Sequence, residues 1–190
     1  MSISITEEAS PDWRTYAAIE SRFIVGSILD VVPSSDGTFS LVERSVAAPW
    51  EKNYDAIPNE HPTDWPRQFD VRPWAVLLAH ADGELAGGAV VATDSPELDM
   101  LEHCPDLAVL WDIRVRPDWR GRGVGTRLFR AAAELSGRRG KRELKVETQN
   151  INAPACRFYA RMGCELRVVT PGTYASLPDE MKLLWYLRLL

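Results

Sequence analysis

A strand, a glycine-rich turn and a helix follow one another in the stretch from Leu110 to Gly125, and no other feature constrains the fold as strongly. Bulky apolar residues alternate with polar ones from Val109 to Arg116, which is the two-residue period of a strand with two different faces. Pro117 ends that strand, and from Val124 the apolar residues recur at helical spacing. The sequence therefore predicts a tight connection between the end of a strand and the beginning of an amphipathic helix.

The connection favours an anionic ligand. The first N–H groups of a helix have no partner within the helix, and the helix dipole adds about half a positive charge there, so a pyrophosphate can bind. Glycines let the backbone approach such a ligand. The G-x-G-x-G spacing matches neither the dinucleotide-binding G-x-G-x-x-G nor a P-loop, which requires Lys-Ser or Lys-Thr. The residues expected to bind the anion are those of the turn and of the first turn of the helix: Arg120, Gly121, Arg122, Gly123, Val124, Gly125 and Thr126.

Length and composition indicate one globular domain over residues 1–190. No apolar run approaches the ~18 residues that span a membrane, and the N-terminal residues lack the basic and apolar regions of a signal peptide, so we expect a cytoplasmic protein with no membrane partner. Three cysteines without a C-x-x-C pair predict reduced packing residues. The three histidines are isolated, and we expect no metal site.

Charge is distributed unevenly along the chain. The net charge is −5, but residues 114–145 hold 11 of the 22 Lys and Arg residues and only three acidic residues. A basic stretch can indicate nucleic-acid binding, but the strongly acidic remainder would repel a polyanion, so we expect no nucleic-acid partner. An anionic cofactor at the basic part and a cationic substrate near the acidic part fit better. The alternative is that these are solvated helix faces that happen to be basic.

The order of the expected elements indicates an α/β protein. Antiparallel hairpins come first and a strand-helix-strand-helix-strand unit follows, which predicts a twisted mixed sheet with helices on both faces. A proline-rich loop with several aromatic residues is expected at 48–73, where it could serve as a binding loop or lid. Asp82-Gly83 is a strong hairpin signal. Strands are expected at 2–6, 22–32, 39–46, 74–79, 85–93, 110–116, 143–148, 165–169 and 181–189, and helices from Ser10-Pro-Asp12, from Val124 and from Asn152.

The turn also carries a family resemblance. Arg120-x-x-Gly123-x-Gly125, placed between a strand and an amphipathic helix, resembles the [Q/R]-x-x-G-x-[G/A] signature of the GNAT-type N-acetyltransferases. The resemblance implies the GNAT fold and acetyl-CoA as co-substrate, with its pyrophosphate at the turn. It further implies that free backbone groups of the central strand hold the pantetheine arm and the acetyl carbonyl. Those groups belong to Ile113, Arg114 and Val115.

A second segment resembles the same family. Asn152-x-x-Ala155-x-x-Phe158-Tyr159-x-x-x-Gly163 is similar to the family's N-x-x-A-x-x-F-Y-x-x-x-G-F segment, with Cys164 in place of the final Phe. The resemblance implies that Asn152 contacts the cofactor and that Tyr159 protonates the departing thiolate. A tyrosine hydroxyl with an ordinary pKa near 10 is a competent donor to a thiolate. The alternative is that Tyr159 only packs beside Phe158.

Acetyl transfer to an amine also needs the amine to arrive neutral. Lowering an amine of pKa ~10.4 to the neutral form at pH 7 costs roughly 4 to 5 kcal/mol, so a base or a water relay is expected. The resemblance to the GNAT enzymes also implies that the central strand splays apart from its neighbour. Asp112 and Glu147 lie in the two strands expected to flank this splay, and either could take or relay the proton. Each could equally be an exposed structural carboxylate.

A closer resemblance is to the streptothricin acetyltransferases. The segment Glu147-Thr-Gln-Asn-Ile-Asn-Ala-Pro-Ala-Cys-Arg-Phe-Tyr159 is similar to their ETQN-x-N-x-x-AC-x-FY segment, and an Asp179-Glu…Trp-Tyr-Leu187 ending is also shared. The patch Trp50-Glu-Lys-Asn-Tyr-Asp55 matches their aromatic-E-K-x-Y-D patch. Trp111 departs from the pattern, because many of those relatives have an acidic residue at this position, directly before the residue that corresponds to Asp112. The patch supplies the candidate substrate-binding residues, which could hold a cationic amine by ion pairs and cation–π contact: Trp50, Glu51, Tyr54 and Asp55.

Three functions remain open at this point. The first is an N-acetyltransferase for an antibiotic or another small amine, such as the β-lysine amine of a streptothricin. The second is an acetyltransferase for a protein N-terminus or lysine, and the third is a non-catalytic acyl-CoA-binding sensor. The carboxylates and Tyr159 argue against the third. The sequence does not define the oligomeric state and leaves a homodimer open.

Overall fold

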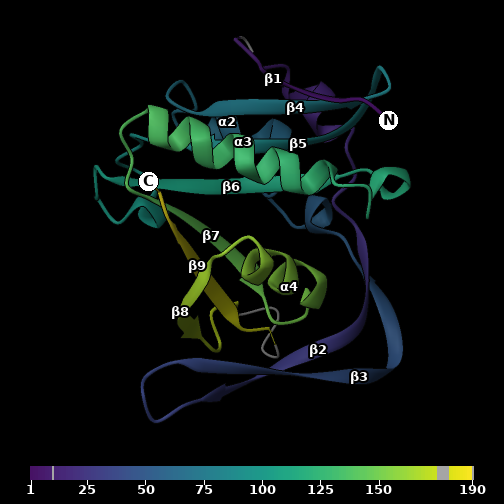
Figure 1. Ribbon diagram of the computed structural model, residues 1–190, viewed down its shortest axis with the longest axis vertical. Helices are drawn as coiled ribbons and strands as arrows, with labels where there is room; N and C mark the ends of the chain where they lie inside the picture. Colours follow the sequence, from purple (N-terminus) through teal and green to yellow (C-terminus); the bar gives the residue numbers. More distant parts are fainter. Residues whose placement is uncertain (10, 175–179, 190) are drawn as a thin grey trace. The chain divides into compact units, whose positions relative to one another are not determined.

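The computed structural model describes residues 1–9, 11–174 and 180–189 (Figure 1). Ser10 of the expected helix cap and Asp179 of the Asp-Glu pair lie outside the described residues. The chain forms two compact units. Unit 1 comprises Met1–Arg22, Asn53–Leu144 and the end of the chain, and unit 2 comprises Phe23–Lys52 and Lys145–Arg188. One domain over residues 1–190 stays a prediction.

Four antiparallel strands form the sheet of unit 1. Their order is β1-β4-β5-β6, and each is antiparallel to its neighbour. The expected Asp82-Gly83 hairpin joins β4 to β5, and both turn residues have positive φ angles, 50° and 89°. Such angles are what a tight hairpin turn requires. The bounds are β1 Ile3–Glu7, β4 Ala75–Ala81, β5 Glu84–Ala92 and β6 Leu107–Val115.

Helices cover both faces of this sheet, as predicted. The helix α3 (Val124–Arg138) contacts all four strands, and Figure 1 shows it lying along them. Two adjacent glycines of β5 point to opposite faces. A Cβ at Gly87 would lie 3.2 Å from the Val124 side chain of α3, whereas one at Gly88 would lie 2.6 Å from the ring of Tyr16 in α1 (Trp13–Ala17). Both helices therefore approach the sheet closely because β5 has no side chain at these two positions.

The close approach at Gly88 predicts a stability effect. Tyr16 and Ile19, the two side chains that a methyl group at Gly88 would meet, are both fully buried. We expect Gly88→Ala to lower the free energy of unfolding by about 1 to 3 kcal/mol, the usual cost of overpacking a core. Gly137→Ala is the matched control, because this glycine lies in α3 with open space around it, and alanine there should be neutral or stabilising. Urea unfolding of both variants measures the difference, and equal stability would contradict this packing of α1 on β5.

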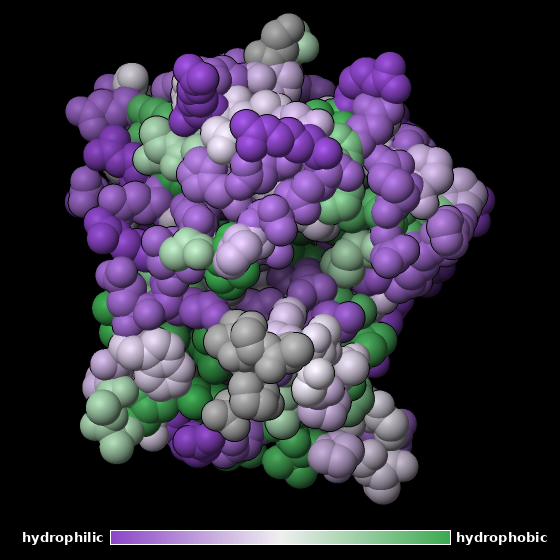
Figure 2. Space-filling model, turned by 180° about the vertical axis from the view of Figure 1, so that it is seen from behind, coloured by the Kyte–Doolittle hydropathy of each residue, from purple (hydrophilic) through white to green (hydrophobic). Residues whose placement is uncertain are grey.

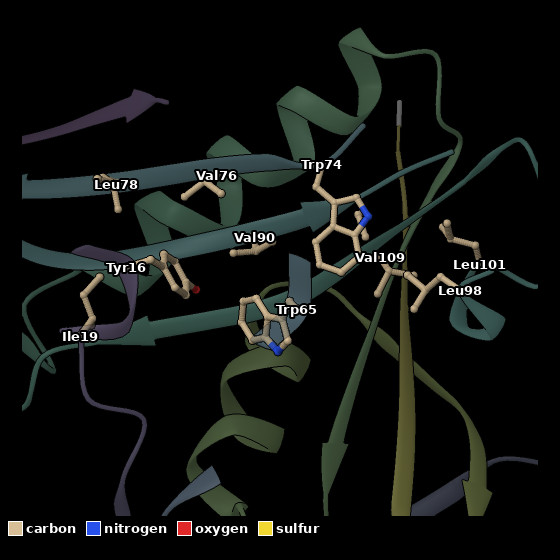
Figure 3. Packing of buried hydrophobic residues seen from close by; sticks show 11 residues of the cluster. Tyr16, Ile19, Trp65, Trp74, Val76, Leu78, Val90, Leu98, Leu101 and Val109 are labelled. Carbon is tan, nitrogen blue, oxygen red and sulfur yellow. The ribbon is translucent and has the colours of Figure 1, made fainter. Parts of the chain in front are cut away.

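An aromatic core fills the α1 face of the sheet (Figure 3). Trp65 is only 3% exposed, and its ring meets Trp13 and Trp111 edge to face, with centroids 5.6 and 6.1 Å apart. Phe69 stacks on Trp74 at 5.7 Å. The expected binding loop or lid at 48–73 is therefore wrong for Trp65, which is buried in the core, and for Phe69, which is partly buried and packs against that core. Three short helices hold this segment against the sheet: η1 Tyr54–Ala56, η2 Pro62–Asp64 and α2 Trp65–Gln68.

Unit 2 contains a long hairpin, three further strands and a helix. The antiparallel hairpin of β2 (Phe23–Pro33) and β3 (Phe39–Lys52) forms a two-stranded sheet. The second strand was expected to end at Val46, but β3 continues to Lys52, so Trp50 and Glu51 lie in a strand and not in a flexible loop. The other strands have the order β7-β9-β8 and lie with α4: β7 Glu143–Gln149, β8 Glu165–Thr170, β9 Lys182–Arg188 and α4 Ala153–Arg161.

A buried ion pair within unit 2 joins one residue from each of two sequence motifs. The Lys52 ammonium lies 2.6 Å from a carboxylate oxygen of Glu180, and each side chain is about one-tenth exposed. Lys52 belongs to the aromatic-E-K-x-Y-D patch and Glu180 to the Asp-Glu pair near the C-terminus. The two patches that resemble the streptothricin acetyltransferases thus meet at this ion pair.

The described residues include no helix that is both long and apolar enough to cross a membrane. The face drawn in Figure 2 carries mostly hydrophilic side chains, with hydrophobic ones scattered among them. Large apolar side chains that are exposed include Ile24 and Val42 of the β2-β3 hairpin.

Candidate active site

A β-bulge shapes the central strand β6. Asp112 pairs with Val90 of β5 and Leu110 pairs with Val91, so Trp111 is an extra residue between two register positions. Because a bulge interrupts the alternation of side chains, Trp111 and Asp112 both reach the α1 face of the sheet. The plain alternation expected from Val109 to Arg116 is therefore wrong at this point. The bulge directs an acidic side chain toward α1 directly beside the aromatic core.

Four side chains of unit 1 meet at this bulge, and we call them the Arg114 cluster: Tyr16, Asp55, Asp112 and Arg114. The Tyr16 hydroxyl donates a 2.9 Å hydrogen bond to Oδ2 of Asp112, and Nε of Arg114 donates a 2.6 Å hydrogen bond to the same oxygen. Nη1 of Arg114 donates to the backbone carbonyl of Ile19 at 3.0 Å and to Oδ2 of Asp55 at 3.2 Å. The guanidinium also lies over the Tyr16 ring, 5.1 Å from its centroid.

Two features determine the electrostatics of the cluster: its side chains are buried or partly buried, and it contains more negative than positive groups. The Arg114 side chain is 4% exposed. Burial alone opposes its charge, but Asp112, Tyr16 and Asp55 outweigh burial, so the pKa of Arg114 is raised. Burial, reinforced by the neighbouring Asp112 carboxylate, raises the pKa of Tyr16 well above its usual value, so its hydroxyl stays a donor. Two carboxylates and one guanidinium give the cluster a formal charge of −1.

The cluster changes the interpretation of two predicted site residues. The backbone contact of Arg114 with the cofactor stays a prediction, and the structure adds that its side chain is the buried centre of this cluster. Asp55 was expected in a flexible substrate-binding loop, but it lies in η1, where its backbone N–H bonds to Ser21 and Asn53. Of the predicted substrate-binding residues, Tyr54 and Asp55 lie in η1 of unit 1, and Trp50 and Glu51 lie in β3 of unit 2.

The turn before α3 has the conformation that its glycines allow. Gly121 and Gly123 have φ angles of 73° and 87°, which residues with a side chain adopt rarely. Gly123 is the N-cap of α3, and no side chain caps this end of the helix. Gly121, Arg122 and Gly123 are exposed. The first N–H groups of α3 therefore point to a site where an anion can bind.

Two arginines flank the turn in different ways. The Arg120 guanidinium donates to the carbonyl of Val115 at 3.0 Å and to that of Arg22 at 2.9 Å, so it fixes the turn to the end of β6. Burial lowers the pKa of Arg120. The Arg122 guanidinium lies 5.2 Å from the centre of the Trp119 ring. The structure thus gives Arg120 a structural contact that the sequence did not predict.

Asn152 and Tyr159 lie on α4 in unit 2. The Asn152 side chain accepts a 3.2 Å hydrogen bond from the Ala155 N–H, which makes it the N-cap of α4. Tyr159 is 5% exposed, and its ring lies 5.4 Å from Phe158 and 6.4 Å from Trp185. The Tyr159 ring therefore packs against Phe158, as the alternative interpretation expected. The role of the Tyr159 hydroxyl as a proton donor stays a prediction.

The cap gives a way to separate two roles of Asn152. We expect Asn152→Ala to lower the free energy of unfolding by about 1 kcal/mol, because the α4 N-terminus loses its cap, while Asn152→Ser retains a capping oxygen and most of the stability. If the Asn152 amide also contacts the cofactor, both variants will bind CoA more weakly than the wild type. Thermal unfolding and calorimetry with CoA measure the two properties separately. Equal stability of the alanine variant and the wild type would contradict the cap.

Glu147 lies at the end of a hydrogen-bond chain in unit 2 that runs from Gln149 through Tyr174. The Tyr174 hydroxyl donates a 2.6 Å hydrogen bond to Oε1 of Glu147 and accepts one of 2.7 Å from the Gln149 amide. Sequence analysis missed both Tyr174 and Tyr16, since neither lies in a motif. Gln149 was visible as the third residue of the E-T-Q-N segment, although nothing in the sequence indicated its partner.

Comparison with known proteins defines the class of protein. The model of the acetyltransferase (GNAT) family matches residues 41–164, more than half of the chain. The chain belongs to this family and is an acetyltransferase. It is 30% identical to the streptothricin acetyltransferase of Streptomyces lavendulae over 169 residues, which cover 89% of this chain and 85% of that protein.

Two solved structures are similar to the whole chain. The crystal structure of nourseothricin acetyltransferase has a TM-score of 0.76 and 25% identity, with 100% of both chains covered. A Bacillus anthracis protein provisionally described as a streptothricin acetyltransferase, solved in complex with acetyl coenzyme A, has a TM-score of 0.79 and 24% identity, with 99% of this chain and 100% of that one covered.

These matches test the predictions of the family, the fold class, the enzyme class and the acetyl donor. The family, the α/β class with a mixed sheet in the GNAT fold, and the enzyme class are confirmed. GNAT enzymes use acetyl-CoA as co-substrate, so the predicted acetyl donor is confirmed as well. The roles of individual residues stay predictions.

Proposed function

We propose that this enzyme transfers the acetyl group of acetyl-CoA to a primary amine of a small cationic molecule. The β-lysine amine of a streptothricin-type antibiotic is the leading candidate acceptor, and its acetylation would give antibiotic resistance. One observation carries this proposal: the likeness to a streptothricin acetyltransferase extends over 89% of the chain. The shared Glu147–Tyr159 segment and the Lys52–Glu180 ion pair between two further shared patches support it.

On the donor side, the turn before α3 is the proposed pyrophosphate site. Arg120, Gly121, Arg122, Gly123, Val124, Gly125 and Thr126 make up that site in this proposal. The uncapped helix N-terminus and the two left-handed glycines support it. Backbone groups of residues 113–115 and the Asn152 amide complete the proposed cofactor contacts.

On the acceptor side, the distribution of charge supports the proposal. Residues outside 114–145 carry most of the acidic side chains of a chain with net charge −5. The Arg114 cluster adds a formal charge of −1 beside the aromatic core, which favours a cation over an anion. Trp50 and Glu51 of β3, together with Tyr54 and Asp55 of η1, are the proposed substrate-binding residues.

The proposed chemistry has four parts. A carboxylate, Asp112 or Glu147, takes or relays a proton from the ammonium so that the neutral nitrogen can attack the thioester carbonyl carbon. The carbon–nitrogen bond forms, the carbon–sulfur bond breaks, and the electron pair of that bond leaves on sulfur. The Tyr159 hydroxyl gives its proton to this thiolate, which releases CoA as the thiol. The attacking nitrogen then loses its second proton, which returns through solvent to the Tyr159 oxygen and leaves a neutral amide.

An acetylation assay with several acceptors tests this proposal. Streptothricin, an aminoglycoside, spermidine and a lysine-rich peptide compete for the enzyme under identical conditions, with thiol release and product mass as readouts. We expect the small amines to be acetylated, with streptothricin preferred. Acetylation of the peptide alone would favour a protein acetyltransferase, and CoA binding without any turnover would favour an acyl-CoA sensor.

The double variant Glu51→Gln, Asp55→Asn should raise the KM for small amines, and an unchanged KM would contradict the acceptor assignment. Cytoplasmic location and a homodimer stay predictions.

A further inference from the structure

The two carboxylate oxygens of Asp112 differ in the hydrogen bonds that they accept. Both of its hydrogen bonds, from the Tyr16 hydroxyl and from Nε of Arg114, end on Oδ2. The side chain is 21% exposed, compared with 4% for Arg114. One oxygen of this carboxylate is therefore fixed by the protein, whereas the described residues donate no hydrogen bond to the other, Oδ1.

The donors themselves are held firmly. Tyr16 is fully buried in the aromatic core (Figure 3). Its ring lies so close to Gly88 of β5 that a Cβ there would be 2.6 Å from it. Arg114 is held on its other side by the Ile19 carbonyl and by Asp55. Neither donor can follow Asp112 if that side chain turns away, so together they hold the carboxylate in one orientation.

We propose that Asp112 receives the ammonium group of the acceptor on Oδ1, and that Tyr16 and Arg114 are positioning residues that orient Asp112 for this contact. This inference rests on the proposed function, because it names the group that recognises the acceptor. Tyr16 and Arg114 contact no substrate in this scheme. They act through the Asp112 carboxylate.

The charges around Asp112 agree with this role. Arg114 on β6 and Asp55 on η1 form a pair beside it, Tyr16 on α1 contributes a neutral donor, and the residue opposite it on β5 is the apolar Val90. Arg114 forms ion pairs with both Asp112 and Asp55, at 2.6 and 3.1 Å, so the two carboxylates together retain one formal negative charge. An acceptor ammonium would neutralise that charge without displacing any contact in the cluster.

Tyr16→Phe is the direct test, because it removes the hydroxyl and keeps the buried ring and its contact with Arg114. Charge-assisted hydrogen bonds contribute about 1.5 kcal/mol or more, which corresponds to about a tenfold change. We expect the KM for small cationic amines to rise about tenfold while the affinity for CoA changes less than about twofold. Tyr186→Phe, a buried tyrosine in β9, is the matched control and should leave the KM for the amine unchanged.

A double-mutant cycle separates positioning from a merely structural effect. If Tyr16 acts through Asp112, the Tyr16→Phe, Asp112→Asn double variant will have the KM of Asp112→Asn alone, whereas independent structural effects will add. Thermal unfolding of every variant confirms that it folds. Additive effects, an unchanged KM in Tyr16→Phe, or an equal loss in the Tyr186 control would overturn the proposal.

Calorimetry distinguishes failure of this inference from failure of the proposed function. Streptothricin and spermidine are titrated into the CoA-bound wild type and into CoA-bound Tyr16→Phe. Weaker binding to the variant supports the inference even if neither amine is acetylated, in which case only the proposed function fails. Acetylation with equal binding to both proteins would overturn the inference alone, and absence of binding to the wild type would overturn both.

Discussion

Replacing Gly123 with aspartate will raise the Kd for CoA at least about 100-fold, equivalent to roughly 2.7 kcal/mol. The residue caps α3 with a φ angle of 87°, at the point where the proposed pyrophosphate meets the first N–H groups of the helix. An aspartate there places a negative charge against another anion. A side chain at this positive φ angle strains the backbone, so the stability of the variant is measured together with its affinity. Calorimetry with CoA measures the affinity directly.

Gly123→Asn is the matched control for this experiment. Asparagine has nearly the same shape, tolerates a positive φ better than most residues and carries no charge. If charge is the cause, the asparagine variant will retain much more affinity than the aspartate variant. Similar losses in both would point to steric blocking, and wild-type affinity in the aspartate variant would show that the pyrophosphate binds elsewhere.

The second large effect is expected at Tyr159. Tyr159→Phe should lower kcat by about 100-fold or more while the affinity for CoA stays nearly intact, which is the range for loss of a general acid. Phenylalanine keeps the ring contacts with Phe158 and Trp185, so packing should not change. Steady-state kinetics and calorimetry give the two quantities. An unchanged kcat would return Tyr159 to a packing role, and a parallel loss of CoA affinity would indicate a binding role.

The fold was predictable where short-range signals are strong. Asp82-Gly83 identified the β4-β5 hairpin, the G-x-G-x-G turn identified the start of α3, and Asn152 followed by Pro154 identified the start of α4. Each of these signals depends only on the conformations that a few adjacent residues allow. The prediction of a loop at 48–73 was wrong for Trp65 and Phe69 for the opposite reason. Its prolines suggested a loop, but the gain from burying Trp65 and Phe69 depends on strands that are distant in sequence.

The site was less predictable because its contacts are long-range. Tyr16 and Asp112 are 96 residues apart in the chain, and Arg114 and Asp55 are 59 apart. Nothing in a single sequence couples such positions. The bulge at Trp111 was also hidden, since an extra residue in one strand is defined only by the register of its partner. The sequence therefore named Asp112, Arg114 and Asp55 as candidates without showing that they form one cluster.

The ion pair between Lys52 and Glu180 has a consequence for the evolution of this family. Removing one partner of a buried ion pair typically costs about 3 to 5 kcal/mol, whereas joint replacement of both partners by apolar residues is often tolerated. Substitutions at the two positions should therefore be inherited together, although 128 residues separate them. Divergent descendants of a common ancestor should carry both charges or neither, and intermediates with one charge should be rare.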